Sequence, residues 1–324
     1  MITTGYRIFA TLVVFWLVAT NASQRVVSAA TTEQKLVGKR GFVIVNGVKL
    51  YYLDWGGRGE TILLLAGFGD TADVFDEFAA KFTDRFHVLG LTRRGFGESE
   101  KSKGGYEVST RVEDTHQFLE ALKIERVNIV GHSMAGDELT LFAILYPQCV
   151  NKLVYLDAAH DRTPQAYLEY FGDPVFIQNT SDHGMRSRRM FMEVLDLPGA
   201  SDVAVKDMPP AEEWEVLIAT QRATIAFHGE YSRVQAPALA FYATSINTHY
   251  PSTWLPRDVD DDLRARADQW WKESGITFSR ASAARFRKEM PHGRVVELND
   301  ADHYIFRGKT EEEVVRQTRS FLLE

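Results

Sequence analysis

Short apolar runs alternate with amphipathic stretches along most of the chain. Each run is long enough for one strand, and an uninterrupted run such as residues 61–66 is typical of a strand that is covered on both faces. Strands that alternate with helices favour a mostly parallel sheet. The six runs are TILLLAG (61–67), HVLGLT (87–92), VNIV (127–130), KLVYLDAA (152–159), PALAFYA (237–243) and RVVEL (294–298).

A hairpin precedes these runs. The segment GFVIVNGVKLYYLDWGG (41–57) predicts two strands joined at Asn46-Gly47, because Asn-Gly is a strong signal for a two-residue turn. The hairpin and the six runs together predict an eight-stranded α/β sheet with helices on both faces. One of these helices is expected over 110–124, opened by a capping box of Thr110 and Glu113.

The interval 159–236 is helical in pattern and rich in Met, Phe, Tyr and Arg. Because it separates two core strands, we expect a helical cap there, between core segments 36–158 and 237–324. Its apolar side chains either line a substrate pocket or form the cap's own core. They include Tyr167, Tyr170, Phe171, Phe176, Met190, Phe191 and Met192. A stretch at about 245–290, with Trp254, Trp270 and Trp271, either extends the cap or packs outside it.

The first 30 residues have the pattern of a secretory signal peptide. One arginine precedes thirteen uncharged residues, and small residues follow near Ala22 and Ala30. Thirteen residues are short for a membrane span, so we expect export to the periplasm or the medium, with no stable membrane insertion of the mature chain. The alternatives are a retained membrane anchor and an over-long start on a cytosolic protein.

Composition narrows the class of protein. A chain of 324 residues with 45% hydrophobic content can bury one large core plus an insertion. The net charge of −7 argues against a nucleic acid partner. Cys149 is the only cysteine, so no disulfide can form within the chain. The sequence has no metal-binding spacing, and we expect neither a metal nor another cofactor.

A serine stands where the strand 127–130 meets a helical stretch, in the sequence GHSMAG (131–136). So tight a corner strains the backbone at Ser133 and needs small residues on either side, here Gly131 and Ala135. The pattern resembles the G-x-S-x-G nucleophile elbow of the α/β-hydrolase fold, with Ala135 at the second glycine. The alternative is a serine that only caps the helix.

Three more segments carry this resemblance, which runs from about residue 40 to 324 and is weakest across the cap. LNDADHYIF (298–306) places His303 where the family keeps its catalytic base. LLLAGFGD (63–70) lies where the family has its oxyanion loop, with Ala66 at the position of the usual histidine. TRRGFGES (92–99) resembles the turn D-x-R-G-x-G-x-S, with Thr92 in place of Asp.

The resemblance implies a serine hydrolase of the esterase and lipase-like branch. Ser133 would be the nucleophile and His303 the general base. The backbone N–H groups of Phe68 and Met134 would form the oxyanion hole. The expected substrate is a small or medium carboxylic ester. We expect His132, next to the serine, to be a buried packing residue.

The acid that orients His303 has more than one candidate. The common family position, after the seventh strand, has no Asp or Glu until Asp258. The sixth strand ends in LVYLDAAHD (153–161), which places Asp157 next along the sheet from the serine strand. Because pancreatic-type lipases keep their acid at this strand end, Asp157 is the first choice. Asp258 and then Asp161 follow.

Other functions stay open at this point. GFGDTA (67–72) matches a loose dinucleotide fingerprint, but that reading leaves Ser133 and His303 unexplained. The same fold and triad also serve lactonases, aminopeptidases, cofactor-free perhydrolases and non-catalytic binders of small molecules. The aspartate nucleophile of the family's epoxide hydrolases is excluded, because the elbow residue is serine. The sequence gives no oligomeric state.

Overall fold

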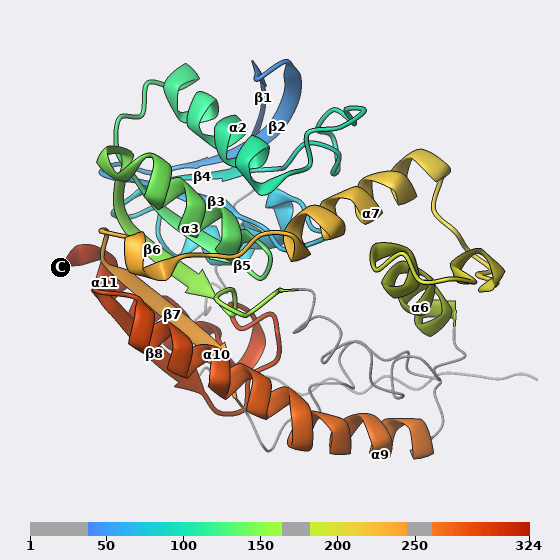
Figure 1. Cartoon of the computed structure of the whole chain (residues 1–324). Coiled ribbons are helices and arrows are strands. Elements are labelled where there is room, and N and C mark those ends of the chain that lie inside the picture. The colour runs from blue at the N-terminus through green and yellow to red at the C-terminus, as the bar shows by residue number, and fades with distance from the viewer. Residues whose placement is uncertain (1–37, 164–181, 245–260) are drawn as a thin grey trace, which may run out of the picture. The chain divides into compact units, whose positions relative to one another are not determined.

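An eight-stranded sheet forms the centre of the fold in the computed structural model, which describes residues 38–163, 182–244 and 261–324 (Figure 1). Its spatial order is β1-β2-β4-β3-β5-β6-β7-β8. Strand β2 is antiparallel to β1 and β4, and all other neighbours are parallel. The predicted sheet is therefore confirmed. The strands are β1 (Lys39–Val45), β2 (Val48–Gly56), β3 (Thr61–Leu65), β4 (His87–Leu91), β5 (Val127–His132), β6 (Val150–Leu156), β7 (Ala238–Ala243) and β8 (Gly293–Leu298).

The β1–β2 hairpin turns at Asn46-Gly47, as predicted. Val45 pairs directly with Val48, so the loop has two residues. Asn46 has φ 47° and Gly47 has φ 75°, the positive values that a type I′ turn requires.

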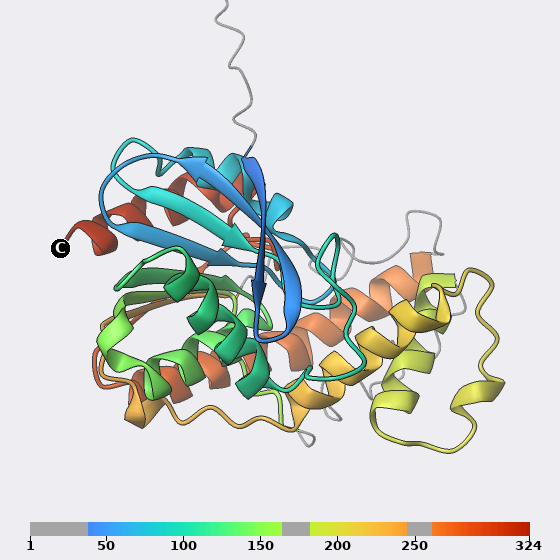
Figure 2. The same ribbon diagram turned by 90° about the horizontal axis from the view of Figure 1, so that it is seen from above.

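Helices cover both faces of the sheet (Figure 2). A hydrophobic core lies on each face of the sheet, and strand β3 contributes side chains to both. Ile62 and Leu64 face α1 and α11, while Leu63 and Leu65 face α2, α3 and α10. The helices are α1 (Asp76–Ala80), α2 (Val108–Ala121), α3 (Ala135–Leu145), α6 (Asp182–Val194), α7 (Ala211–Ile225), α9 (Asp261–Trp270), α10 (Ile276–Glu289) and α11 (Glu311–Leu323). Short 3₁₀ helices are η1 (Ala72–Phe75), η2 (Pro147–Cys149), η3 (Ala200–Asp202), η4 (Tyr231–Arg233) and η6 (Gly308–Thr310), and η5 (Trp271–Gly275) is a π-helix between α9 and α10.

The predicted capping box at the start of α2 is wrong. The helix begins at Val108, two residues before Thr110, and Glu107 occupies the N-cap position without a side-chain cap bond. Val108 and Val112 are both buried in the core that covers this face of the sheet. Because Val108 is buried in this core, the helix begins two residues before the capping signal at Thr110. Thr110 therefore lies inside the first turn.

The described part of the interval 159–236 contains α6 and α7 and no strand. These helices share a core that includes Phe191 and Trp214, with Met190 and Met192 packed against it. Tyr167, Tyr170, Phe171 and Phe176 lie outside the described residues. The cap boundaries at 159 and 236 stay predictions.

The stretch after β7 packs partly on the main sheet rather than only in a cap. Phe286 of α10 is buried against the sheet, and Trp270 of α9 is buried in the core on the opposite face. Trp254 and the Trp271 side chain lie outside the described residues, as does the predicted signal peptide at 1–30. Within 38–163, 182–244 and 261–324, no helix is long and apolar enough to cross a membrane.

Candidate active site

The corner between β5 and α3 is strained and tightly packed. Ser133 has φ 54°, a left-handed conformation that costs a non-glycine residue about 1 kcal/mol or more. A Cβ on Gly131 would lie 2.4 Å from Leu139 Cδ1, and one on Gly136 would lie 2.0 Å from the Ala158 carbonyl oxygen. The small residues of this motif therefore let α3 pass close to β5 and to the loop after β6.

Three side chains meet at the carboxyl edge of the sheet. Ser133 Oγ lies 2.8 Å from His303 Nε2, and His303 Nδ1 lies 2.7 Å from Asp157 Oδ2. They follow β5, β8 and β6 respectively. The structure thus brings together the three residues chosen from the sequence. The alternative acid Asp258 lies outside the described residues, and Asp161 Oδ1 accepts a hydrogen bond from the Thr163 N–H in its own turn.

Asp157 is held as a carboxylate. Burial alone would raise its pKa, but the charges and hydrogen bonds of His160 and His303 outweigh burial, so the pKa of Asp157 lies well below its usual range. The Ala243 N–H at the end of β7 donates to Oδ1 over 3.0 Å. A fixed carboxylate of this kind holds the ring of His303 in one orientation.

Two other histidines brace this chain of hydrogen bonds. His160 Nε2 lies 3.1 Å from Asp157 Oδ1, a contact that no motif in the sequence indicates. His132 is buried, as predicted, and burial also lowers its pKa well below the usual value. Its Nε2 lies 2.9 Å from the carbonyl oxygen of His303, which can only accept, so His132 is a neutral donor that ties down the backbone of His303.

The two predicted oxyanion donors flank Ser133. A Cβ on Gly67 would lie 3.2 Å from Ser133 Cβ, so the loop after β3 lies against the elbow. Among the described residues, neither the Phe68 nor the Met134 N–H donates to another group. The side chain of Phe68 packs against a cluster of Phe96, Tyr106 and Val216, and Val216 belongs to α7, so this loop is linked to the predicted cap. Ala66, at the position of the family's histidine, is buried in the core.

Residues 60–309 match the family model of the alpha/beta hydrolase fold. The chain belongs to this family. A segment of 102 residues is 37% identical to an uncharacterized protein of Mycobacterium tuberculosis and covers 32% of this chain and 30% of that protein. A segment of 128 residues is 28% identical to human epoxide hydrolase 4 and covers 39% of this chain and 34% of that protein. The chain thus spans about a third of the length of these relatives.

Among solved structures, this alpha/beta hydrolase resembles the enol-lactonase from Burkholderia xenovorans. The TM-score is 0.59 at 21% sequence identity, over 88% of this chain and 100% of that one. So low an identity shows the fold alone.

Charged side chains surround the elbow at Ser133. Arg93 Nε donates to Glu138 Oε1 over 2.6 Å, and Arg111 lies 3.5 Å from the same carboxylate oxygen. Arg162 lies 3.4 Å from Asp137 Oδ1. Burial raises the pKa of Asp137 to about 6, although Arg162 and Arg111 oppose this. No motif in the sequence indicates this cluster, because its members come from four separate segments.

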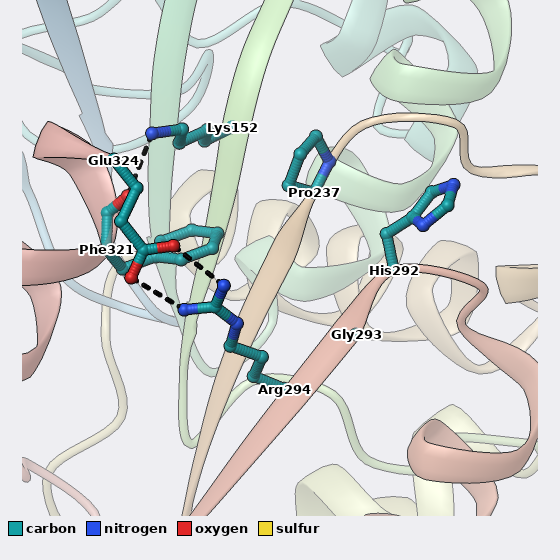
Figure 3. A pocket seen from close by; sticks show the side chains of 7 residues that line it. All are labelled: Lys152, Pro237, His292, Gly293, Arg294, Phe321 and Glu324. Atoms are coloured by element: carbon teal, nitrogen blue, oxygen red, sulfur yellow. Dashed lines mark hydrogen bonds and ion pairs between the residues drawn. The ribbon is translucent and has the colours of Figure 1, made fainter.

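A pocket of about 500 Å³ lies at the opposite, amino-terminal edge of the sheet (Figure 3). Lys152 donates to the carbonyl oxygens of Phe321 and Leu322, and Arg294 pairs with Glu324, so its cations already have partners. The lining residues are Lys152, Pro237, His292, Gly293, Arg294, Phe321 and Glu324. Within the described part of the chain, no three His, Cys, Asp or Glu side chains lie close enough together to hold a metal.

Replacing Gly136 by alanine should destabilise the protein by about 1–3 kcal/mol, even though alanine favours helices. The new Cβ would stand 2.0 Å from a backbone oxygen, which cannot move without shifting the loop after β6. Urea unfolding measures the change. Gly104→Ala is the control, because a Cβ there meets nothing within 4 Å. Equal stability of the two variants would show that the corner is not tightly packed.

Asp137 should make stability depend on pH. Its pKa of about 6 in the native state exceeds the value of ~4 expected in the unfolded chain, so the native state binds the extra proton between these values. The wild type should therefore gain about 1 kcal/mol relative to Asp137→Asn when the pH falls from about 7 to about 5. Urea unfolding of both proteins at the two pH values measures this gain. A difference that does not change with pH would contradict it.

Proposed function

We propose that this protein is a serine hydrolase that cleaves small or medium carboxylic esters through an acyl-enzyme intermediate. Ser133 is the nucleophile, His303 the general base and Asp157 the acid that orients it. The backbone N–H groups of Phe68 and Met134 stabilise the oxyanion. The observation that carries the proposal is the pair of hydrogen bonds, 2.8 Å and 2.7 Å long, that joins Ser133 to His303 and His303 to Asp157.

The reaction has two halves. Ser133 Oγ attacks the ester carbonyl while His303 Nε2 takes the hydroxyl proton, and the carbonyl oxygen becomes an anion that accepts from Phe68 and Met134. The tetrahedral intermediate collapses, and His303 returns the proton to the departing alcohol. Water then attacks the acyl-serine, again with His303 as base, and releases the acid and free Ser133.

Several features support Asp157 as the acid. Its pKa, held low by His160 and His303, keeps it charged, so it can stabilise the imidazolium that forms on His303. The second oxygen is fixed by the Ala243 N–H, which leaves Oδ2 aimed at the base. A carboxylate fixed in this way holds the imidazole in the tautomer whose Nε2 carries no proton and accepts the one from Ser133.

An acyl group suits a serine nucleophile better than an epoxide does. Serine opening an epoxide would leave an ether on the enzyme, and water does not readily cleave ethers. An acyl-serine, in contrast, is an ester that the same base and oxyanion hole can hydrolyse. A lactone is a cyclic ester, so lactone opening is the nearest alternative, and the resemblance to an enol-lactonase favours including it in the test.

The purified protein should hydrolyse para-nitrophenyl butyrate without added metal or cofactor. Ser133→Ala should lower kcat by about 10⁶-fold and Asp157→Asn by about 10⁴-fold, because the amide favours the wrong tautomer of His303. Initial rates on a panel of esters of increasing chain length, one lactone and one amide measure the effect and the preference.

Asp161→Asn is the matched control, since this carboxylate lies in the same loop but bonds within its own turn. Its kcat should stay within about threefold of the wild type. Undiminished turnover by Ser133→Ala would end the proposal. If Asp157→Asn keeps wild-type activity while folded, the acid is another residue and only the serine–histidine pair stands.

A further inference from the structure

We propose that Arg93 and Arg162 are positioning residues that hold and polarise the two oxyanion-donating peptides. This inference rests on the proposed function. The Gly67 carbonyl and the Phe68 N–H belong to one peptide group, and Arg93 donates to that carbonyl over 3.2 Å. The other donor shows the same arrangement.

The second peptide group joins the Ser133 carbonyl to the Met134 N–H. Arg162 donates to the Ser133 oxygen over 2.8 Å, in addition to the Gly136 N–H at 3.0 Å, which is an ordinary contact of the first helical turn. Each proposed oxyanion donor thus has a guanidinium group on the opposite end of its own peptide.

The geometry of the peptide bond gives these contacts a consequence. In a planar trans peptide the C=O and N–H groups point in opposite directions, so fixing the oxygen also fixes the direction of the N–H. A cation on the oxygen also polarises the peptide and makes its N–H a stronger donor, especially where water is excluded. Both effects favour an anion at the site that Phe68 and Met134 share.

Two adjacent acids on α3 hold the two arginines. Glu138 pairs with Arg93, and their side chains are 2% and 4% exposed. Asp137 pairs with Arg162, whose side chain is 15% exposed. Helix α3 starts directly behind the nucleophile, so both arginines are anchored to the element that carries Ser133.

Fold stability is a poor explanation for these pairs. Taking charges out of water costs several kcal/mol per ion, and buried pairs often contribute less stability than apolar residues of the same size. In the described part of the chain, Arg93 also has one guanidinium nitrogen without a partner. A role in positioning the peptides accounts for such a costly arrangement at this place.

The oxyanion forms only in the transition state, so the two arginines should act on kcat and not on KM. Arg162→Met should lower kcat for para-nitrophenyl butyrate by about 10–100-fold, less than the loss of a whole donor, with KM changed by less than about threefold. The affinity for a boronic acid, which forms a tetrahedral adduct with serine, should fall in parallel. Arg162→Lys should restore part of both losses.

Arg126→Met is the matched control, because Arg126 also donates to a backbone carbonyl, that of Val150, but at the other edge of the sheet. It should leave kcat, KM and boronate affinity unchanged. The variant Arg93→Gln removes the other guanidinium group and leaves Glu138 paired with Arg111. It should lower kcat and boronate affinity as Arg162→Met does. If Arg162→Met does not fold, this variant tests whether an arginine positions an oxyanion-donating peptide.

A folded Arg162→Met or Arg93→Gln variant with wild-type kcat would overturn the inference. So would a loss of kcat without a loss of boronate affinity, because that result would mean the arginines act on something other than the tetrahedral state. If the wild-type protein itself hydrolyses no ester, the proposed function fails, and that failure is separate from this one.

Discussion

The strained corner at Ser133 is the constraint on which the rest of the site depends. The left-handed backbone there turns the chain from β5 into α3 and sets the serine hydroxyl at the carboxyl edge of the sheet. The corner fits only because Gly131 and Gly136 let α3 approach its neighbours closely. The same turn begins the helix that carries Asp137 and Glu138, so one piece of backbone positions the nucleophile, one proposed oxyanion donor and the anchors of two arginines.

The parallel strands of the sheet position the other groups of the site. Strands β5, β6, β7 and β8 are consecutive in the sheet, and each delivers one group at its carboxyl end. Ser133, Asp157 and His303 follow three of these strands, and the N–H of Ala243, the last residue of β7, holds the acid. In this way Ser133 and His303, which are 170 positions apart in the chain, come within hydrogen-bonding distance.

Features that depend on a few neighbouring residues, or on the order of motifs along the chain, could be predicted from the sequence. The Asn46-Gly47 turn and the apolar strand runs predicted the sheet, because each depends on a few neighbouring residues. His303 and Asp157 could be proposed because the resemblance to the α/β-hydrolase fold implies which strand ends carry the base and the acid. The contacts of Arg93 and Arg162 could not be predicted, since each depends on a backbone atom and a side chain from another segment of the chain. The start of α2 failed for the same reason: burial of a valine overrode the local capping signal.

The most direct measurement is covalent labelling of the folded wild-type protein with an alkyl fluorophosphonate, which forms a stable adduct only with an activated serine. Peptide mapping by mass spectrometry locates the adduct, and residual ester hydrolysis is measured on the same sample. The mechanism predicts one adduct per chain on Ser133, formed in step with the loss of activity and absent from Ser133→Ala. An adduct on another residue that removes activity, or no adduct on a folded and active protein, would contradict it.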